Sequence, residues 1–214
     1  MIGQGKLFIV TAPSGAGKTS LVSALVEKSS ITDSSRSLAV SVSHTTRPKR
    51  PNEIDGENYH FIDENSFLYM LKAGDFLEEA QVYGHRYGTS RQWVNQQLAQ
   101  GVDVILEIDW QGAEQIKKIY LDCCYIFILP PSLEVLVKRL RDRAQDDQDT
   151  IEDRMKEAKS VMEHADDADY LVVNDNFNRA LADIQAIIHA ERLKIGTAIN
   201  PFSASAKPVS RVTK

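Results

Sequence analysis

The residues best suited to chemistry lie near the start of the chain, in the string APSGAGKTS at residues 12–20. The string matches the phosphate-binding P-loop pattern at Gly17, Lys18 and Thr19, although Ala12 stands where the first glycine is usual. Glycines let backbone N–H groups turn inward around a polyphosphate, and the N-terminus of a following helix adds positive charge. The lysine can reach the β- and γ-phosphates, and the threonine hydroxyl can ligate Mg²⁺. The string predicts binding of a nucleoside triphosphate, but it does not separate a GTPase, an ATPase and a small-molecule kinase.

A second string, SVSHTTRPKRPNEIDGENYHF, places Arg47, Lys49 and Arg50 close together and adds Tyr59. Two prolines keep the backbone between the basic residues extended. Guanidinium groups and a phenol together suit a phosphate monoester, which they bind through charge-assisted hydrogen bonds. The same composition also suits a solvent-exposed basic turn, and the string alone leaves both interpretations open.

Both strings must be held in place by regular elements, and the surrounding pattern indicates which ones. The P-loop string lies between a continuous apolar run, KLFIVTA, and a helical pattern in TSLVSALVEK. Such a run is typical of a strand that is buried on both faces. Similar runs follow in DVILEID, CYIFIL and YLVVN, and helical patterns occur at residues 91–100, 111–118, 133–143, 151–164 and 178–194. Short apolar strands alternating with helices predict an α/β fold with a parallel sheet flanked by helices.

Three segments depart from this alternation. Residues 39–90 contain short strand patterns, turns and one helix at 64–73, which predicts an insert that carries a substrate site. The polar segment RAQDDQDT at 143–150 lies between two helical patterns, and it is either a solvated acidic loop or a mobile lid. The residues from 196 onward lack periodicity, which predicts a disordered tail.

Composition narrows the classes of protein. The chain has 214 residues, 43% hydrophobic and 26% charged, which is ordinary for a globular protein. A formal net charge of -5 argues against a nucleic-acid partner bound through overall basicity. No apolar window approaches the roughly 18 residues of a membrane helix, so we expect no membrane partner.

The two cysteines, Cys123 and Cys124, are adjacent at the start of a predicted buried strand, and they suit neither a disulfide nor a zinc site. Two cysteines that suit no disulfide, together with the absence of a signal-peptide pattern, predict a reducing, cytoplasmic location. The five histidines have no ligand spacing, and none is assigned to a metal.

Four strings, APSGAGKT, SVSHTTRPKRPNEIDGENYHF, FLEEAQVYGHRYGTS and EIDWQG, occur in an order and spacing that resemble the bacterial guanylate kinases. The resemblance runs over residues 5–188. It implies a P-loop NTPase core (5–38 and 91–188), a small mixed GMP-binding insert (39–90) and a helical lid at about 140–155. It also implies that ATP and GMP are the substrates, that the γ-phosphate of ATP passes to GMP, and that Mg²⁺ accompanies ATP.

The resemblance assigns roles to individual residues. Those implied to bind ATP are Ala12, Pro13, Ser14, Gly15, Ala16, Gly17, Lys18, Thr19 and Asn174, with Thr19 also at the metal. Those implied to bind GMP are Ser43, Glu78 and Thr89 at the guanine, Arg47, Arg50, Tyr59 and Tyr87 at the phosphate, and Asp109 near the acceptor and metal. The implied catalytic residues are Lys18, Arg47, Arg139, Arg143, Arg154 and Asp109. Glu107 and Ala144 depart from the family pattern, which has aspartate and glycine there.

The chemistry of guanine agrees with the role implied for Glu78. Guanine presents two adjacent N–H donors, and an ionised carboxylate can accept both, whereas hydroxyl groups such as those of Ser43 and Thr89 can donate to O6. On local pattern alone, Glu78 could equally be a surface carboxylate, and Arg139 could lie on the solvated face of a helix.

Two other functions remain as alternatives: a non-catalytic guanylate-kinase-like module that binds phosphopeptides, and another small-molecule P-loop kinase. The complete Gly17-Lys18-Thr19 sequence argues against the first, and Glu78 with Thr89 argues against the second. The oligomeric state is open, and a homo-oligomer is among the options.

Overall fold

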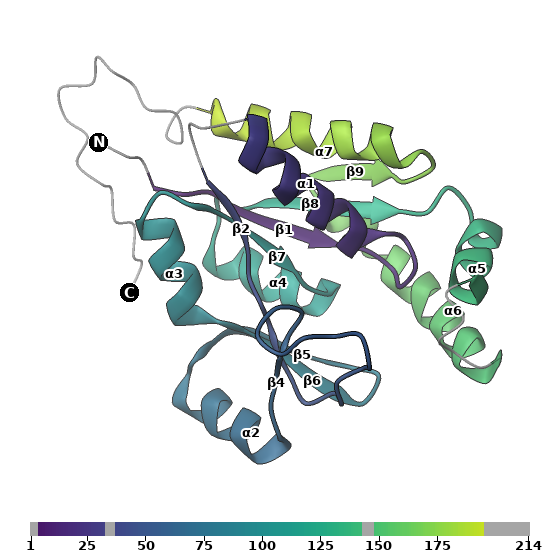
Figure 1. Ribbon diagram of the computed structural model, residues 1–214, viewed down its shortest axis with the longest axis horizontal. Helices are drawn as coiled ribbons and strands as arrows, with labels where there is room; N and C mark the ends of the chain where they lie inside the picture. Colours follow the sequence, from purple (N-terminus) through teal and green to yellow (C-terminus); the bar gives the residue numbers. More distant parts are fainter. Residues whose placement is uncertain (1–3, 33–36, 143–147, 195–214) are drawn as a thin grey trace.

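The computed structural model describes residues 4–32, 37–142 and 148–194. Its centre is a five-stranded parallel sheet with the strand order β2-β7-β1-β8-β9 (Figure 1). The strands are β1 (Leu7–Thr11), β2 (Leu38–Val40), β7 (Asp103–Glu107), β8 (Cys124–Leu129) and β9 (Tyr170–Val173). The predicted α/β fold with a parallel sheet is confirmed.

The sheet has a hydrophobic core on each face, because its central strands are mostly apolar and bury side chains on both faces. The helices α1 (Lys18–Thr32) and α7 (Phe177–Arg192) cover one face, and α3 (Arg91–Ala99) and α4 (Trp110–Ile119) cover the other (Figure 1). Alternate residues of β1 divide between the two cores, with Phe8 in the first and Ile9 in the second.

The insert forms a second, four-stranded sheet with the order β4-β3-β6-β5. Its elements are β3 (His44–Thr45), β4 (His60–Phe61), α2 (Glu64–Ala73), β5 (Phe76–Val82) and β6 (His85–Ser90). The core and the insert meet where β5 packs against α4.

One boundary differs from the sequence prediction. β2 pairs in parallel with β7 in the core sheet, so Ala39 and Val40 belong to the core rather than to an insert that begins at residue 39. β2 has only three residues and is partly buried, so it lacks the continuous apolar run that marks the other core strands. The other end of the insert, residue 90, coincides with the end of β6.

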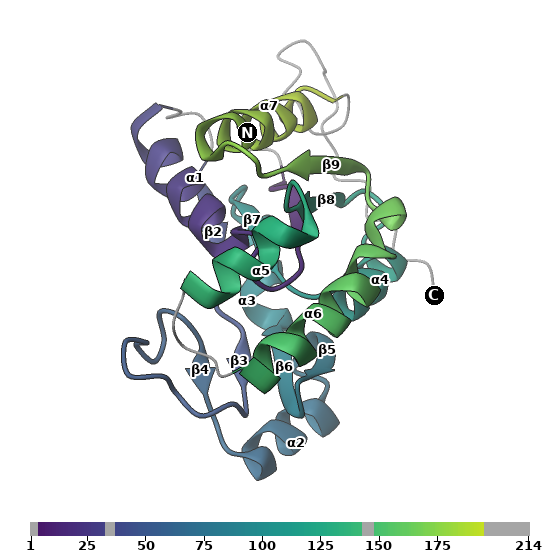
Figure 2. The ribbon, with the colours of Figure 1, turned by 90° about the vertical axis from the view of Figure 1, so that its right-hand side faces the viewer.

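Two helices follow β8 and lie at the end of the sheet where the P-loop is found. α5 (Leu133–Asp142) and α6 (Gln148–Met162) pack against each other around Leu136, Leu140 and Ala158, and a short 3₁₀ helix (Ala165–Asp167) leads into β9 (Figure 2). Residues 148–150, predicted to be loop or lid, are the first turn of α6. Arg143, the other residues of the predicted lid loop up to 147, and the predicted tail lie outside the described residues.

Cys124 is buried at the start of β8, and Cys123 precedes it; both thiols are free. Burial raises the pKa of the Cys123 thiol to about 11 and raises that of Cys124 further. In the parts of the chain that the structure describes, no helix is long and apolar enough to cross a membrane.

Candidate active site

A cavity of about 620 Å³ lies between the P-loop, the end of β7, the insert and α6. It opens at the carboxyl ends of β1 and β7, where open α/β sheets bind their ligands. Its wall includes the following predicted site residues: Ala12, Pro13, Ser14, Gly15, Gly17, Lys18, Thr19, Ser43, Arg47, Arg50, Tyr59, Glu78, Tyr87, Asp109, Arg139 and Arg154. Ala16, Thr89 and Asn174 are buried and do not line the cavity. The fold thus brings nearly all of the predicted residues to one space.

The P-loop has the backbone conformation that its glycines permit. Gly15 and Gly17 have φ of 89° and 94°, values that residues with a side chain rarely adopt. A Cβ at Gly17 would also lie 2.4 Å from Asn174 Nδ2, so glycine is required there on two grounds. The Asn174 amide group donates to the Ala16 carbonyl over 2.7 Å, which supports the loop from behind. The expected contact of Asn174 with adenine stays a prediction.

Lys18 begins α1 and points to the end of β7, where its Nζ donates to the Ile108 carbonyl over 3.1 Å. Burial lowers the pKa of Lys18, and the charges of Glu107, Asp109 and Glu78 oppose that change. Asp109 is the N-cap of α4, and its Oδ1 accepts from the Gly112 N–H over 2.9 Å. Burial raises the pKa of Asp109. A phosphate group entering the cavity would therefore meet a lysine that is already held in position.

Thr19 and Glu107, beside Lys18, are joined by a hydrogen bond. The Thr19 hydroxyl donates to Glu107 Oε2 over 3.0 Å, and both groups are exposed toward the cavity. A carboxylate and a hydroxyl are hard oxygen donors, and Mg²⁺ bound with a nucleotide needs only one or two such protein ligands. The residues present therefore fit Mg²⁺. Within the described segments no cluster of three or more His, Cys, Asp or Glu could hold a metal by itself.

Glu78, on β5 of the insert, lines the cavity and is nearly closed off from solvent. Only 4% of the residue is exposed, and its Oε1 accepts from Thr89 Oγ1 over 2.6 Å. Thr89 Oγ1 lies 3.3 Å from Ser43 Oγ, which extends the chain of polar groups. Burial raises the pKa of Glu78 to about 7, the Thr89 hydrogen bond opposes the change, and the charge of Asp109 adds to it. The structure thus excludes the surface interpretation of this carboxylate.

A basic and aromatic group lines the cavity beside Glu78. The Arg47 guanidinium lies 5.4 Å from the centre of the Tyr59 ring, and Tyr59 meets the Tyr87 ring edge to face. Glu53 was not identified from the sequence: its Oε1 accepts from Arg47 over 2.7 Å, and its Oε2 accepts from the Arg50 backbone N–H over 2.8 Å. Together these contacts hold Arg47 against the aromatic rings and fix the Arg50 backbone beside it.

Arg139 on α5 is oriented by the same asparagine that supports the P-loop. One guanidinium nitrogen, Nη2, donates to the Asn174 carbonyl over 2.9 Å, whereas Nη1 is buried and has no hydrogen-bond partner among the residues that the structure describes. A buried cationic N–H without a partner favours an anionic ligand at this wall of the cavity.

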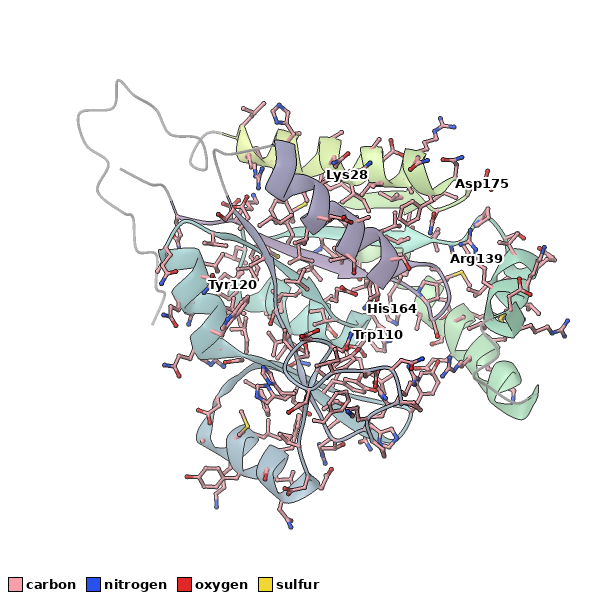
Figure 3. The ribbon with its side chains drawn as sticks, viewed as in Figure 1. Lys28, Trp110, Tyr120, Arg139, His164 and Asp175 are labelled. Carbon is pink, nitrogen blue, oxygen red and sulfur yellow. The ribbon has the colours of Figure 1, made fainter. Side chains whose placement is uncertain are left out.

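Two aromatic contacts connect α6 and the residues just after it to the rest of the site. The Arg154 guanidinium lies 5.8 Å from the centre of the Tyr83 ring in the β5–β6 turn of the insert. Just beyond the C-terminus of α6, His164 stacks on Trp110, the first residue of α4, with ring centroids 3.7 Å apart (Figure 3). These two contacts join α6 to the insert and to the α4 end of the cavity.

Two residues at the site were not predicted to act there. Glu107 was noted only as a departure from the family pattern, and Glu53 was not singled out. Glu107 could have been found from its place at the end of a buried strand, since parallel strands direct their last residues to one edge. Nothing in the spacing distinguishes Glu53 from the other acidic residues of its loop.

The fold and the cavity define a class of protein. A P-loop at the carboxyl edge of a parallel sheet shares one cavity with a basic insert, which is the arrangement of a P-loop kinase that acts on a small phosphorylated acceptor. The family model "Guanylate kinase" matches residues 4–191. The chain is 53% identical to a guanylate kinase of Methylobacillus flagellatus over 89% of this chain and 92% of that one. It is 54% identical to a guanylate kinase of Alcanivorax borkumensis over 90% of each chain.

Comparison with solved structures gives the same family. The crystal structure of guanylate kinase from Anaplasma phagocytophilum matches with a TM-score of 0.74 and 30% identity, covering 92% of each chain. The chain belongs to the guanylate kinase family, and its activity is that of an ATP:GMP phosphotransferase. The resemblance inferred from the four strings is confirmed, and a non-catalytic module is not favoured.

Proposed function

We propose that the 620 Å³ cavity transfers the γ-phosphate of ATP to GMP, with ATP at the P-loop and GMP at the insert. The observation that carries this assignment is that Glu78 and Ser43, which the buried Thr89 hydroxyl joins, line the same cavity as Lys18. This arrangement supports a reader for an acceptor base and a triphosphate site within one cavity.

Glu78, Thr89 and Ser43 read the guanine. The ionised carboxylate of Glu78 accepts from N1–H and from the exocyclic amino group, and the Ser43 hydroxyl donates to O6, while the Thr89 hydroxyl donates to Glu78 and holds it in place. Adenine lacks that pair of donors and would leave a buried carboxylate unpaired. A site built in this way can reject the wrong base by roughly 10⁴-fold.

Arg47, Arg50, Tyr59 and Tyr87 hold the GMP phosphate. The support for this role is that Arg47 is held by Glu53 and stacked on Tyr59 before any ligand arrives, so little side-chain entropy is lost on binding. Asp109, the N-cap of α4, lines the same cavity and would face the acceptor phosphate.

The triphosphate side consists of the P-loop residues 12–19 with Arg139 of α5 and Arg154 of α6, and the family resemblance adds Arg143. Thr19 and Glu107 would hold Mg²⁺, which neutralises charge on the ATP phosphates when it is bound. Lys18 and the arginines spread the charge that develops on the transferred group. Asn174 supports the loop and orients Arg139, and its contact with adenine is part of the proposal.

The reaction needs positioning rather than a strong base, because the attacking GMP phosphate oxygen is already anionic. It attacks the γ-phosphorus in line while the bond to the β-phosphate oxygen breaks, giving ADP and GDP. Closure of α6 over the cavity excludes water, which would otherwise hydrolyse ATP. We place this activity in the cytoplasm, where both nucleotides are found.

A coupled assay with ATP, Mg²⁺ and a panel of nucleoside monophosphates tests the assignment. We expect GMP to be the preferred acceptor by a large factor over AMP, CMP and UMP. Turnover of another phosphorylated acceptor in preference to GMP would support a different small-molecule kinase. Binding of GMP without turnover in the presence of Mg²⁺ and ATP would support a non-catalytic module.

A further inference from the structure

Gly112 is the third residue of α4, and its place in the helix calls for an explanation. Glycine inside a helix is less favourable than alanine, because its backbone loses more conformational freedom on folding. Gly112 is not among the glycines with positive φ, so its backbone conformation does not require glycine. Something outside the helix must therefore account for the missing side chain.

The neighbour of Gly112 is the carboxylate of Glu78. A Cβ at position 112 would lie 2.4 Å from Glu78 Oε2, 3.1 Å from its Cδ and 3.2 Å from the Ile108 Cδ1 atom. The first distance is far inside van der Waals contact, so even a methyl group would have to displace the carboxylate. The space that a side chain would fill is the space that Glu78 occupies.

Glu78 has little freedom to move aside. Its other oxygen, Oε1, is held by Thr89 Oγ1 at 2.6 Å, and the residue is nearly closed off from solvent. A shift away from α4 would lengthen or break that hydrogen bond, and it would also disturb the contact between Thr89 and Ser43. The carboxylate is therefore set between a hydroxyl on β6 and the first turn of α4.

The turn that contacts Glu78 is itself fixed. The Gly112 N–H donates to Asp109 Oδ1 over 2.9 Å, and Gln111 Nε2 donates to Asp109 Oδ2 over 2.9 Å. These bonds anchor the start of α4 at the end of β7. α4 cannot retreat from an added methyl group without loss of its N-cap.

We propose that Gly112 is a specificity-determining positioning residue: its missing side chain sets the place of the Glu78 carboxylate and so the choice of guanine. This rests on the proposed role of Glu78 as the reader of the base. Gly112 does not contact the nucleotide; it acts through Glu78.

The test compares steady-state kinetics of the wild type and Gly112→Ala with GMP and with IMP, which lacks the exocyclic amino group. We expect kcat/KM for GMP to fall at least about tenfold, the scale of one lost charged hydrogen bond. The KM for ATP should stay within about twofold, and the preference for GMP over IMP should shrink. Any loss of thermal stability in Gly112→Ala should come from the clash with Glu78 and not from helix propensity, since alanine favours a helix more than glycine does.

Two further variants sharpen the test. Glu114→Ala changes an exposed residue of the same helix that pairs with Lys118, and it should leave the GMP parameters unchanged. In a Glu78→Ala background the carboxylate is gone, so Gly112→Ala should add no further loss for GMP. If Gly112→Ala fails to fold alone but folds in the Glu78→Ala background, the clash with the carboxylate is supported.

The outcomes separate the two proposals. If Glu78→Ala leaves GMP parameters intact, the role of Glu78 is wrong and that of Gly112 is wrong with it. If Glu78→Ala impairs GMP but Gly112→Ala does not, only the role of Gly112 is wrong. Three other results would overturn the role of Gly112. They are equal losses of kcat/KM for ATP and GMP, an additive loss in the double variant, and failure of Gly112→Ala to fold in both backgrounds.

Discussion

The raised pKa of Glu78 makes the affinity for GMP depend on pH. Burial raises that pKa to about 7, and the charge of Asp109 adds to the effect of burial. Only the ionised carboxylate can accept from both guanine donors, because the protonated form has an O–H of its own. GMP binding should therefore weaken as the pH falls through about 7.

The expected size follows from the fraction of protein that is competent to bind. With a pKa of about 7, about one tenth of the Glu78 groups are ionised at pH 6 and about nine tenths at pH 8. An apparent binding constant is weakened in proportion to the competent fraction. The KM for GMP should rise about tenfold from pH 8 to pH 6. The KM for ATP should not show the rise that protonation of Glu78 causes.

The assay is steady-state kinetics from pH 6 to pH 8.5, with each substrate varied at saturating levels of the other. The phosphate of GMP has its own ionisation near pH 6, which adds to the observed slope. Glu78→Gln retains that ionisation and removes the carboxyl group, so the difference between the two profiles isolates Glu78. If the variant shows the same pH slope as the wild type, the reasoning is refuted.

The same variant has a predicted effect on stability. Between its ordinary pKa of 4.5 and about 7, Glu78 is protonated in the folded chain but ionised in the unfolded chain. The folded state therefore loses stability as the pH rises through this window, by up to about 3 kcal/mol. At pH 8, Glu78→Gln should have a higher free energy of unfolding than the wild type, and the difference should shrink toward pH 4.5. Urea denaturation at the two pH values checks this, and a variant less stable at pH 8 would contradict the cause assigned to the shift.

Three further variants test the triphosphate side. Lys18→Ala should lower kcat by at least about 10²-fold with the fold retained, as judged by circular dichroism, and a loss of only a few-fold would contradict its role. Glu107→Ala should raise the Mg²⁺ concentration needed for half-maximal rate while leaving the KM for GMP unchanged, which a magnesium titration measures; an unchanged magnesium requirement would place the metal elsewhere. Asn174→Ala removes the bond to the Ala16 carbonyl and the proposed contact with adenine, so in donor competition it should weaken ATP more than GTP, whereas equal losses would show that Asn174 acts through the loop alone.

The main elements of the fold could be predicted because their signals are local. β1, β7, β8 and β9 are short apolar runs, and the conformation of the P-loop depends on Gly15 and Gly17 within it. Ala39 and Val40 of β2 were assigned to the insert because a three-residue strand carries too little pattern to be recognised. Its membership of the core sheet depends on pairing with β7, some 65 residues further along the chain, and no local pattern encodes that pairing.

The residues of the site also fall into two groups, those with a local sequence signal and those whose role depends on long-range contacts. The P-loop and the basic string were found from their own spacing, whereas the supporting contacts join distant parts of the chain. Asn174 and Ala16 are 158 positions apart, and Glu53 differs from its acidic neighbours only in what it touches once folded. The types of residue that bind phosphate follow from phosphate chemistry, but the residues that hold them follow from the fold.

Glu78 shows how this division bears on selectivity. In FLEEAQV it stands next to another glutamate, and only the packing of α4 against β5 turns one of the two into a buried acceptor while Glu79 pairs with Arg86. α4 begins at Asp109, just after β7, and β7 pairs along its length with β1, the strand that leads into the P-loop. The wall behind the base reader and the loop that binds the triphosphate are therefore fixed to adjacent strands of one sheet. A change that moves Gly112 should alter the choice of acceptor base before it alters binding of ATP, because Gly112 lies against Glu78, whereas the P-loop is held at Ile108, before α4 begins.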